Sequence, residues 1–295
     1  MKATVQTDIK TPKKASYVAY NVSQFFSKGS AIESKIETVL NQLRDELGVK
    51  GLKRLDEQTI ESYIAILQER VQTNSLSRHT AETYVSALNR VIEYVDHFLD
   101  KNLQTISQSQ FGLTRGSFQY VNRAVSENTH NAFMSFLLEK SDDIRAQALQ
   151  HSVMLQHTFG LRLRESLSIK RETIEQALRT NTLHLTGQDG TKNSRSRDIK
   201  IRTEKQIEAL KSALDFQKEN NLRSLIPTAY LQEQYNFAKN VKDEFNKAYN
   251  NEHYHYHSER HSYAQERLSQ GASKTEVSNE LGHNRESTTK VYANI

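Results

Sequence analysis

The chain has 295 residues, which is enough for two domains of ordinary size. It has no cysteine, and this excludes disulfides, thiol nucleophiles and zinc sites with cysteine ligands. The formal charge of +5 favours polyanionic partners, although many proteins with this charge bind none.

No membrane-spanning segment is evident, because no stretch approaches the roughly 18–20 apolar residues that cross a bilayer. The N-terminus also lacks the apolar run of a signal peptide, so we expect a cytoplasmic protein that contacts no membrane. Only 2 prolines and 10 glycines interrupt the chain. This scarcity favours a mainly α fold with little sheet.

The first third of the chain predicts a small helical domain. Residues 1–29 are basic, polar and weakly patterned, and we interpret them as a tail or arm. Residues 30–105 contain three amphipathic helical stripes, which begin near Ile32, after Asp56 and after Ser77. These stripes indicate a compact helical module.

Several basic positions are candidates for phosphate contacts. Arg78, His79 and Thr80 begin the third predicted helix, where exposed amides and cations favour anions. Arg195 and Arg197 lie in or beside a predicted loop. The plainer alternative, a helix cap surrounded by solvated charges, is at least as common for the helix start.

The helical period breaks over residues 106–127, which we interpret as a linker, and resumes in a second domain over 128–295. The second domain is predicted to begin with helices from near Ala132 and over 144–157, followed by two strands, Thr182–Leu185 and Asp198–Ile201. Four further helices are predicted after the strands: from Thr203, over 231–249, from His257 to Gly271 and from Ser273 to Gly282. The second domain is therefore α+β with a small β-hairpin.

Residues suited to DNA chemistry occur in order along this second domain. The sets are Gly160-Leu161-Arg162-x-x-Glu165, Lys192, His257-x-x-Arg260, Leu281-Gly282-His283 and Tyr292. Cleavage of a phosphodiester without metal or water needs a nucleophile, neutralisation of the transition-state charge and a proton for the leaving oxygen. Arginines neutralise phosphate charge through bidentate hydrogen bonds, which suits Arg162 and Arg260.

The remaining members of the set fit the other two tasks. Tyr292 can attack phosphorus and form a phosphodiester link that conserves the bond energy. Lys192, in the hairpin loop, can supply the proton, while His257 and His283 can donate hydrogen bonds or move the tyrosine proton. Each residue alone is more often structural or solvated, so the interpretation depends on their joint order and spacing.

These motifs, over about residues 155–295, resemble the tyrosine recombinase family of phage-type and Xer-like integrases. The resemblance implies that Arg162 grips the scissile phosphate, that Glu165 buttresses it, and that Lys192 is the β-hairpin lysine. Two alternatives stay open in this alignment: Arg164 could exchange roles with Arg162, and Lys200 could replace Lys192.

The resemblance also implies how the protein acts. It predicts a two-domain, C-shaped clamp on double-stranded DNA, with 30–105 as the core-binding domain and 128–295 as the catalytic domain. Tyr292 would form a 3′-phosphotyrosyl link at a specific recombination site within a homotetramer, in the nucleoid, with no cofactor or metal and with possible accessory proteins. Only three residues follow Tyr292, whereas many relatives continue into a helix that docks on a neighbouring subunit. We therefore expect either a different subunit coupling or a shortened chain.

Three other functions are compatible with parts of the sequence. The first is a strand-passing topoisomerase or hairpin resolvase with the same chemistry. The second is a DNA-binding regulator that no longer catalyses. The third is a metal-binding protein built on His253, His255, His257 and His261, which lacks a cysteine or an acidic cluster to complete the site.

Overall fold

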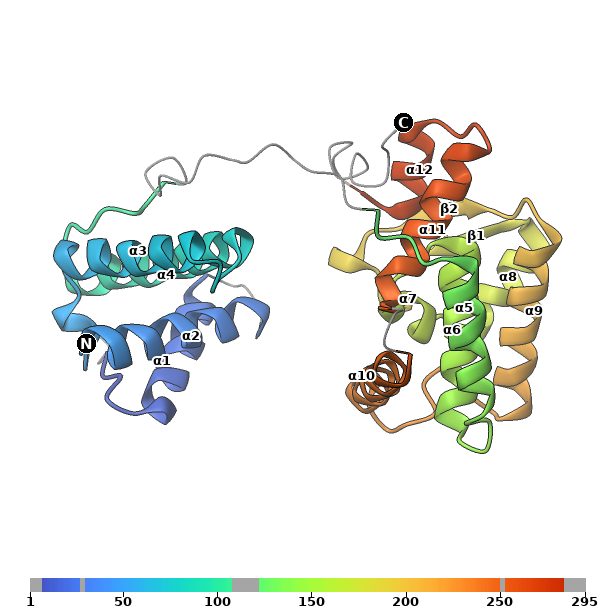
Figure 1. The fold of residues 1–295 in the computed structure, drawn as a ribbon, viewed down its shortest axis with the longest axis horizontal. Helices are drawn as coiled ribbons and strands as arrows, with labels where there is room; N and C mark the ends of the chain where they lie inside the picture. Colours follow the sequence, from blue (N-terminus) through green and yellow to red (C-terminus); the bar gives the residue numbers. More distant parts are fainter. Residues whose placement is uncertain (1–6, 27–29, 108–121, 250–252, 284–295) are drawn as a thin grey trace. The chain divides into compact units, whose positions relative to one another are not determined.

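The structure, a computed structural model, describes residues 7–26, 30–107, 122–249 and 253–283. The chain divides into two compact units, Met1–Phe118 and Gln119–Ile295, whose elements Figure 1 labels. Most of the described residues are helical, and the strands they contain form one two-stranded antiparallel sheet. The predicted mainly α fold with a small β-hairpin is thus confirmed. In the described part of the chain no helix is both long and apolar enough to cross a membrane.

The described residues of the first unit form a bundle of four helices with one 3₁₀ turn. Its elements are α1 (Pro12–Phe25), α2 (Ser30–Leu47), the turn at Leu52–Arg54, α3 (Glu57–Gln72) and α4 (Arg78–Leu99). The predicted caps are present: Asp56 Oδ1 accepts from the Thr59 amide at 2.8 Å, and Ser77 Oγ accepts from the Thr80 amide at 3.1 Å. One apolar core joins the four helices.

The interpretation of residues 1–29 as a tail is wrong for 12–25, which form α1. The Thr11 side chain caps this helix and Pro12 occupies its first turn, where a missing amide hydrogen costs nothing. Ala15, Val18, Ala19 and Val22 are fully buried, at the spacing of one helical face. The stripe was hard to detect because two of its four members are alanines.

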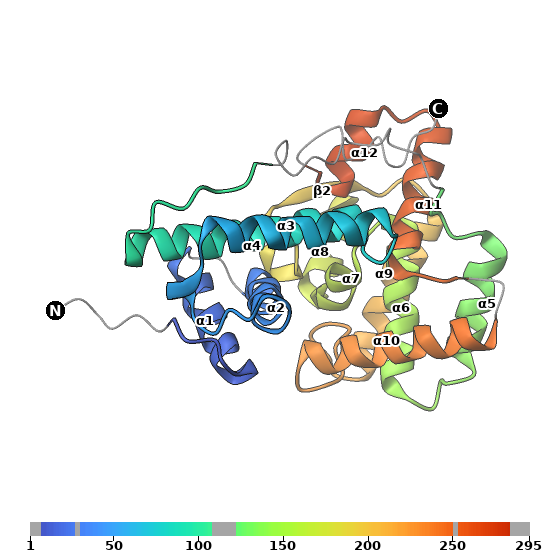
Figure 2. The same ribbon diagram turned by 60° about the vertical axis from the view of Figure 1, so that its left-hand side comes forward.

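The second unit contains eight helices among its described residues. They are α5 (Glu127–Leu138), α6 (Ile144–Phe159), α7 (Leu163–Ser168), α8 (Arg171–Thr180), α9 (Glu204–Glu219), α10 (Leu231–Ala248), α11 (Tyr256–Ser269) and α12 (Lys274–Leu281). Helix α6 lies at the centre and contacts α5, α7, α9, α10 and α11 (Figures 1 and 2). Both predicted capping boxes, at Thr203 and Ser273, are present.

The β-hairpin joins β1 (Thr182–Leu185) to β2 (Arg197–Lys200). The two strands are antiparallel, with Thr182 opposite Lys200 and Leu185 opposite Arg197. The first strand has the predicted bounds, and the second begins one residue earlier than predicted. Because side chains alternate along a strand, Arg197 faces the protein interior with Ile199, while Asp198 and Lys200 face solvent.

Candidate active site

A glycine turn after α6 brings three helices to one place. Gly160 ends α6 with φ +63°, and a Cβ at this position would lie 2.5 Å from the Tyr263 ring and 2.9 Å from the Leu281 side chain. A larger residue would therefore be strained by its backbone and would also separate α6 from α11 and α12. This close approach places Arg162, which immediately precedes α7, beside the first turns of α11.

Arg162 is oriented by a buried carboxylate. The Arg162 amide donates to Glu165 Oε2 and its Nη1 donates to Oε1, both at 2.7 Å. Glu165 is fully buried, whereas the Arg162 side chain is 26% exposed. Arg164, in the first turn of α7, is exposed and packs on Gly190 of the hairpin. The geometry therefore favours Arg162 over Arg164 as the arginine of the site.

The second partner of Glu165 is an arginine of the β-hairpin. Arg197 donates from Nη1 to Oε1 at 2.9 Å and from Nη2 to Oε2 at 2.7 Å. Its side chain is 6% exposed. Arg197 is thus a buried partner of Glu165, and its contact with DNA stays a prediction.

The two arginines keep Glu165 ionised. Burial opposes the charge, but the hydrogen bonds and charge of Arg197, followed by the charge of Arg162, outweigh it and lower the pKa of Glu165 to about 2. Since arginine never loses its proton near neutral pH, the arrangement is a fixed triad of two cations and one anion. It leaves a net positive charge beside the exposed part of Arg162.

Arg260 is fully buried in the first turns of α11 and links the Gly160 turn to α12. Its Nη1 donates to the Gly160 carbonyl at 2.5 Å, and its Nη2 donates to the Leu281 carbonyl. The same Nη2 lies 3.2 Å from Nε2 of His283. These backbone contacts fix the plane of the guanidinium, which is how a site for phosphate is preorganised.

The His283 imidazole is neutral at physiological pH. Burial, followed by the charges of Arg260 and Arg162, lowers its pKa to about 3. Because Arg260 can only donate, we assign the lone pair to Nε2 and the proton to Nδ1. His283 therefore offers one N–H donor and a fixed ring.

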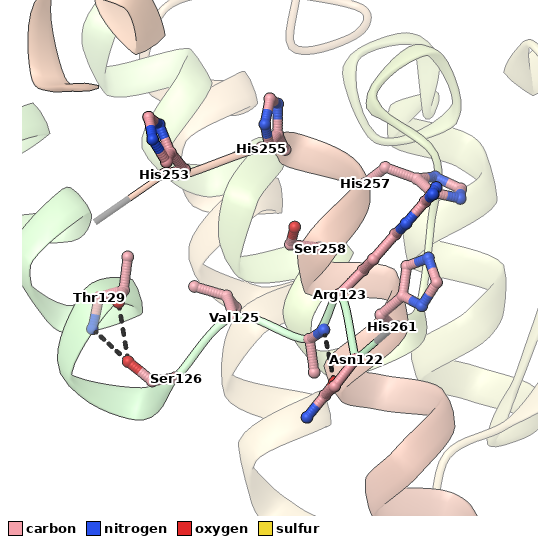
Figure 3. A pocket seen from close by; sticks show the side chains of 11 residues that line it. Asn122, Arg123, Val125, Ser126, Thr129, His253, His255, His257, Ser258 and His261 are labelled. Carbon is pink, nitrogen blue, oxygen red and sulfur yellow. Dashed lines mark hydrogen bonds between the residues drawn. The ribbon is translucent and has the colours of Figure 1, made fainter. Parts of the chain in front are cut away.

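His257 faces an adjoining recess of about 650 Å³ (Figure 3). The residues that line it include Arg123, His253, His255, His257 and His261. Partial burial of its imidazole, followed by the charges of Arg260 and Arg162, lowers the pKa of His257 to about 4, although part of the residue is exposed to solvent. His257 lies three residues before Arg260 on α11, so the two residues are one helical turn apart.

An ion-pair network holds α12 against the rest of the site. Glu280 accepts from the Tyr263 hydroxyl at 2.7 Å, from Arg267 Nε at 3.2 Å and from Arg202 Nη2 at 2.6 Å. This network positions the end of α12, where Gly282 adopts φ +64° and the chain turns into His283.

The structure does not bring every predicted residue to this site. Lys192 and Arg195 are exposed in the connection between β1 and β2, where no described residue forms an ion pair with Lys192. Lys200 is exposed on β2. Tyr292 lies outside the described residues.

The predicted DNA contacts of the first unit lie at the start of α4. His79 is exposed there, Thr80 is half-buried, and Arg78 forms an ion pair with Glu82 at 3.1 Å. The Thr80 amide is already bonded to the Ser77 hydroxyl at 3.1 Å, and the contact of these residues with DNA stays a prediction.

Comparison with known proteins identifies the family. A family model described as the phage integrase family matches residues 123–295, more than half of the chain. The chain belongs to the phage integrase family. It is therefore a tyrosine recombinase, an enzyme that cleaves and rejoins DNA in site-specific recombination.

Solved structures of other recombinases share the fold. XerH recombinase bound to a palindromic difH substrate is 15% identical with a TM-score of 0.63, over 97% of this chain and 81% of that chain. The Tn1549 transposon integrase with circular intermediate DNA is 13% identical (TM-score 0.61, 95% of each chain), and a lambda integrase dimer bound to a COC′ core site is 14% identical (TM-score 0.58, 94% of each chain). No curated protein matched the sequence.

The pairing of Arg197 with Glu165 in this recombinase was not predicted from the sequence, which assigned Arg197 to phosphate contact. We expect Arg197→Met to lower the free energy of unfolding by about 3–5 kcal/mol, because it leaves the buried Glu165 carboxylate with one arginine. Arg195→Met, two residues away and exposed, should change it by less than about 0.5 kcal/mol. Urea unfolding of the two variants measures the difference, and equal losses would contradict the assigned pairing.

Acid should destabilise the recombinase in a defined window. The Glu165 pKa falls from 4.5 to about 2 on folding, so its stabilisation is complete above pH 4.5 and is lost as the pH falls toward 2. This loss amounts to roughly 3 kcal/mol. The free energy of unfolding, measured between pH 5 and 2, should therefore depend less on pH in Glu165→Gln than in the wild type. Parallel curves for the two proteins would show that Glu165 has the same pKa in the folded and unfolded states.

Proposed function

We propose that this recombinase breaks and rejoins DNA at a specific site through a 3′-phosphotyrosyl intermediate, with Tyr292 as the nucleophile. The convergence of Arg162, Arg260 and His283 carries the proposal. These side chains come from three separate segments and supply two cations and a neutral N–H donor. Such a set suits a phosphate that gains negative charge, and it has no evident role in an apolar core.

The steps assign one task to each group. The Tyr292 oxygen attacks phosphorus, the bond from phosphorus to the 5′-oxygen breaks, and Lys192 supplies the proton to that oxygen. Arg162 and Arg260 neutralise the charge of the pentacoordinate transition state, His283 donates a hydrogen bond to the phosphate, and His257 accepts the proton of the Tyr292 hydroxyl. Attack by the 5′-hydroxyl of another strand then reverses the step and releases Tyr292.

The first unit would serve as the core-binding domain. We propose that the start of α4, with Arg78, His79 and Thr80, contacts phosphates on the duplex, and that Arg195 contacts phosphates from the hairpin loop. The two units would then clamp the DNA, and four subunits would assemble on two synapsed sites, with accessory proteins as further partners. The place of action would be the nucleoid in the cytoplasm.

Binding to DNA should depend steeply on salt. A clamp that makes 6–10 phosphate contacts loses about 10³–10⁵ in affinity between 50 and 200 mM salt, because each contact releases counterions. Affinity for the recombination site, measured by fluorescence anisotropy over this range, tests this. A loss smaller than about tenfold would contradict a clamp around the duplex.

A strand-exchange assay separates recombination from regulation by DNA binding alone. Two duplexes that carry the recombination site should yield recombinant products in buffer with a chelator and without nucleotide. Specific binding without exchange or nicking would favour the regulator instead. Relaxation of supercoiled DNA without a site requirement would favour a topoisomerase.

A further inference from the structure

A second polar cluster lies close to the proposed active site but takes no part in the proposed chemistry. Glu259 of α11 accepts from Nδ1 of His130 on α5 at 3.0 Å and from Nδ1 of His157 on α6 at 2.8 Å. The two imidazole rings stack, with centroids 4.1 Å apart and planes 27° apart. The cluster joins three helices that lie side by side in the second unit (Figures 1 and 2).

The charge of Glu259 is poorly compensated compared with that of Glu165. Both carboxylates are fully buried. Glu165 has two arginines, whereas the ion-pair partners that the described residues give Glu259 are His130 and His157. Burial opposes ionisation of Glu259, but the two histidine hydrogen bonds outweigh it and lower its pKa. A buried anion of this kind requires either a protonated histidine or a bound cation.

The three side chains suit a transition-metal ion. One ligand atom from each of them lies within 4.8 Å of the other two. Zinc binds imidazole nitrogen and carboxylate oxygen at about 2.0–2.2 Å in a tetrahedron, so neighbouring ligands are roughly 3.3–3.5 Å apart. Nδ1 of His157 lies 2.8 Å from Oε2 of Glu259 and Nδ1 of His130 lies 3.0 Å from Oε1, so each pair needs to open by about 0.5 Å to admit an ion bound by both carboxylate oxygens.

The cluster is also accessible from solvent. His130 and His157 line a cavity of about 460 Å³, which gives an ion a path of entry. Three carboxylates, of Glu127, Glu208 and Glu266, line the same cavity with one cation, Lys205, so the excess of negative charge raises the local concentration of cations. A water molecule in the cavity would complete four-coordination.

We propose that His130, His157 and Glu259 form a Zn²⁺ site. Each imidazole presents the Nδ1 lone pair to the metal and carries its proton on Nε2 instead. The ion neutralises the Glu259 carboxylate and links α5, α6 and α11. Its ligand on α11, Glu259, immediately precedes Arg260. This proposal does not depend on the recombination chemistry.

Metal titration of the full chain, prepared without histidine tags and stripped with a chelator, tests the site. Calorimetry with Zn²⁺ should give one ion per chain, and Co²⁺ should produce the visible absorption of a tetrahedral complex. Glu259→Gln keeps the shape and a hydrogen-bond acceptor but lacks the charge, and His157→Gln alters a side chain that is 34% exposed. Each variant should weaken Zn²⁺ binding by at least about tenfold.

The double variant His253→Asn/His255→Asn is the matched control. It removes two exposed histidines of the neighbouring recess and should leave the affinity unchanged. The proposal is overturned if the wild type binds no Zn²⁺, if both cluster variants bind as tightly as the wild type, or if only the control loses binding. Circular dichroism checks that each variant is folded.

Discussion

Arg260→Ala should reduce strand cleavage by about 10³-fold or more, because an arginine that stabilises the charge of phosphoryl transfer contributes about this much. DNA affinity should fall far less, since Arg260 is buried and the proposed binding residues lie elsewhere. The variant also leaves the Gly160 and Leu281 carbonyls without their donor, at a cost of about 1–3 kcal/mol for each. Single-turnover cleavage of a nicked duplex, measured well below the melting temperature of the variant, separates the chemical loss from the structural one.

Arg267→Ala is the matched control for this experiment. Arg267 lies two turns further along α11 and contacts Glu280, so its loss also disturbs the packing of α12. It does not contact His283 in the described structure, and we expect cleavage per folded molecule to stay within about tenfold of the wild type. Retention of cleavage by Arg260→Ala, or equal losses in both variants, would contradict the role given to Arg260.

The sequence predicted the parts of the site that depend on local pattern. Gly160 with Arg162 and Glu165, and His257 with Arg260, are short motifs, and each lies at the start or end of a helix. Their convergence could not be read from spacing, because Gly160 and Arg260 meet across 100 residues. The resemblance to a family supplied that step.

The missed contacts share a physical cause. Arg197 was assigned to a loop because a strand of four residues gives too short an alternation to locate its first residue. Its burial follows from the strand register and from Glu165, which is 32 residues away. Glu259 occupies a variable position of the His-x-x-Arg motif, so nothing in the sequence indicated that two distant histidines would contact it.

Tyr292→Phe removes one oxygen and should abolish formation of the covalent complex. The phenol oxygen is the atom that attacks phosphorus in the proposed mechanism, and phenylalanine offers no substitute. The chain has 13 tyrosines, so specificity must be shown. Tyr230→Phe, at a tyrosine that is 69% exposed, is the matched control and should form the complex at the wild-type rate.

The most direct measurement is to trap the covalent complex on a nicked duplex carrying the recombination site and to map the attached nucleotide by peptide mass spectrometry. We expect a single 3′-phosphotyrosyl link at residue 292 in the wild type and in Tyr230→Phe, and no adduct in Tyr292→Phe. An adduct in the Tyr292→Phe variant, or a link mapped to another tyrosine, would contradict the account of this active site.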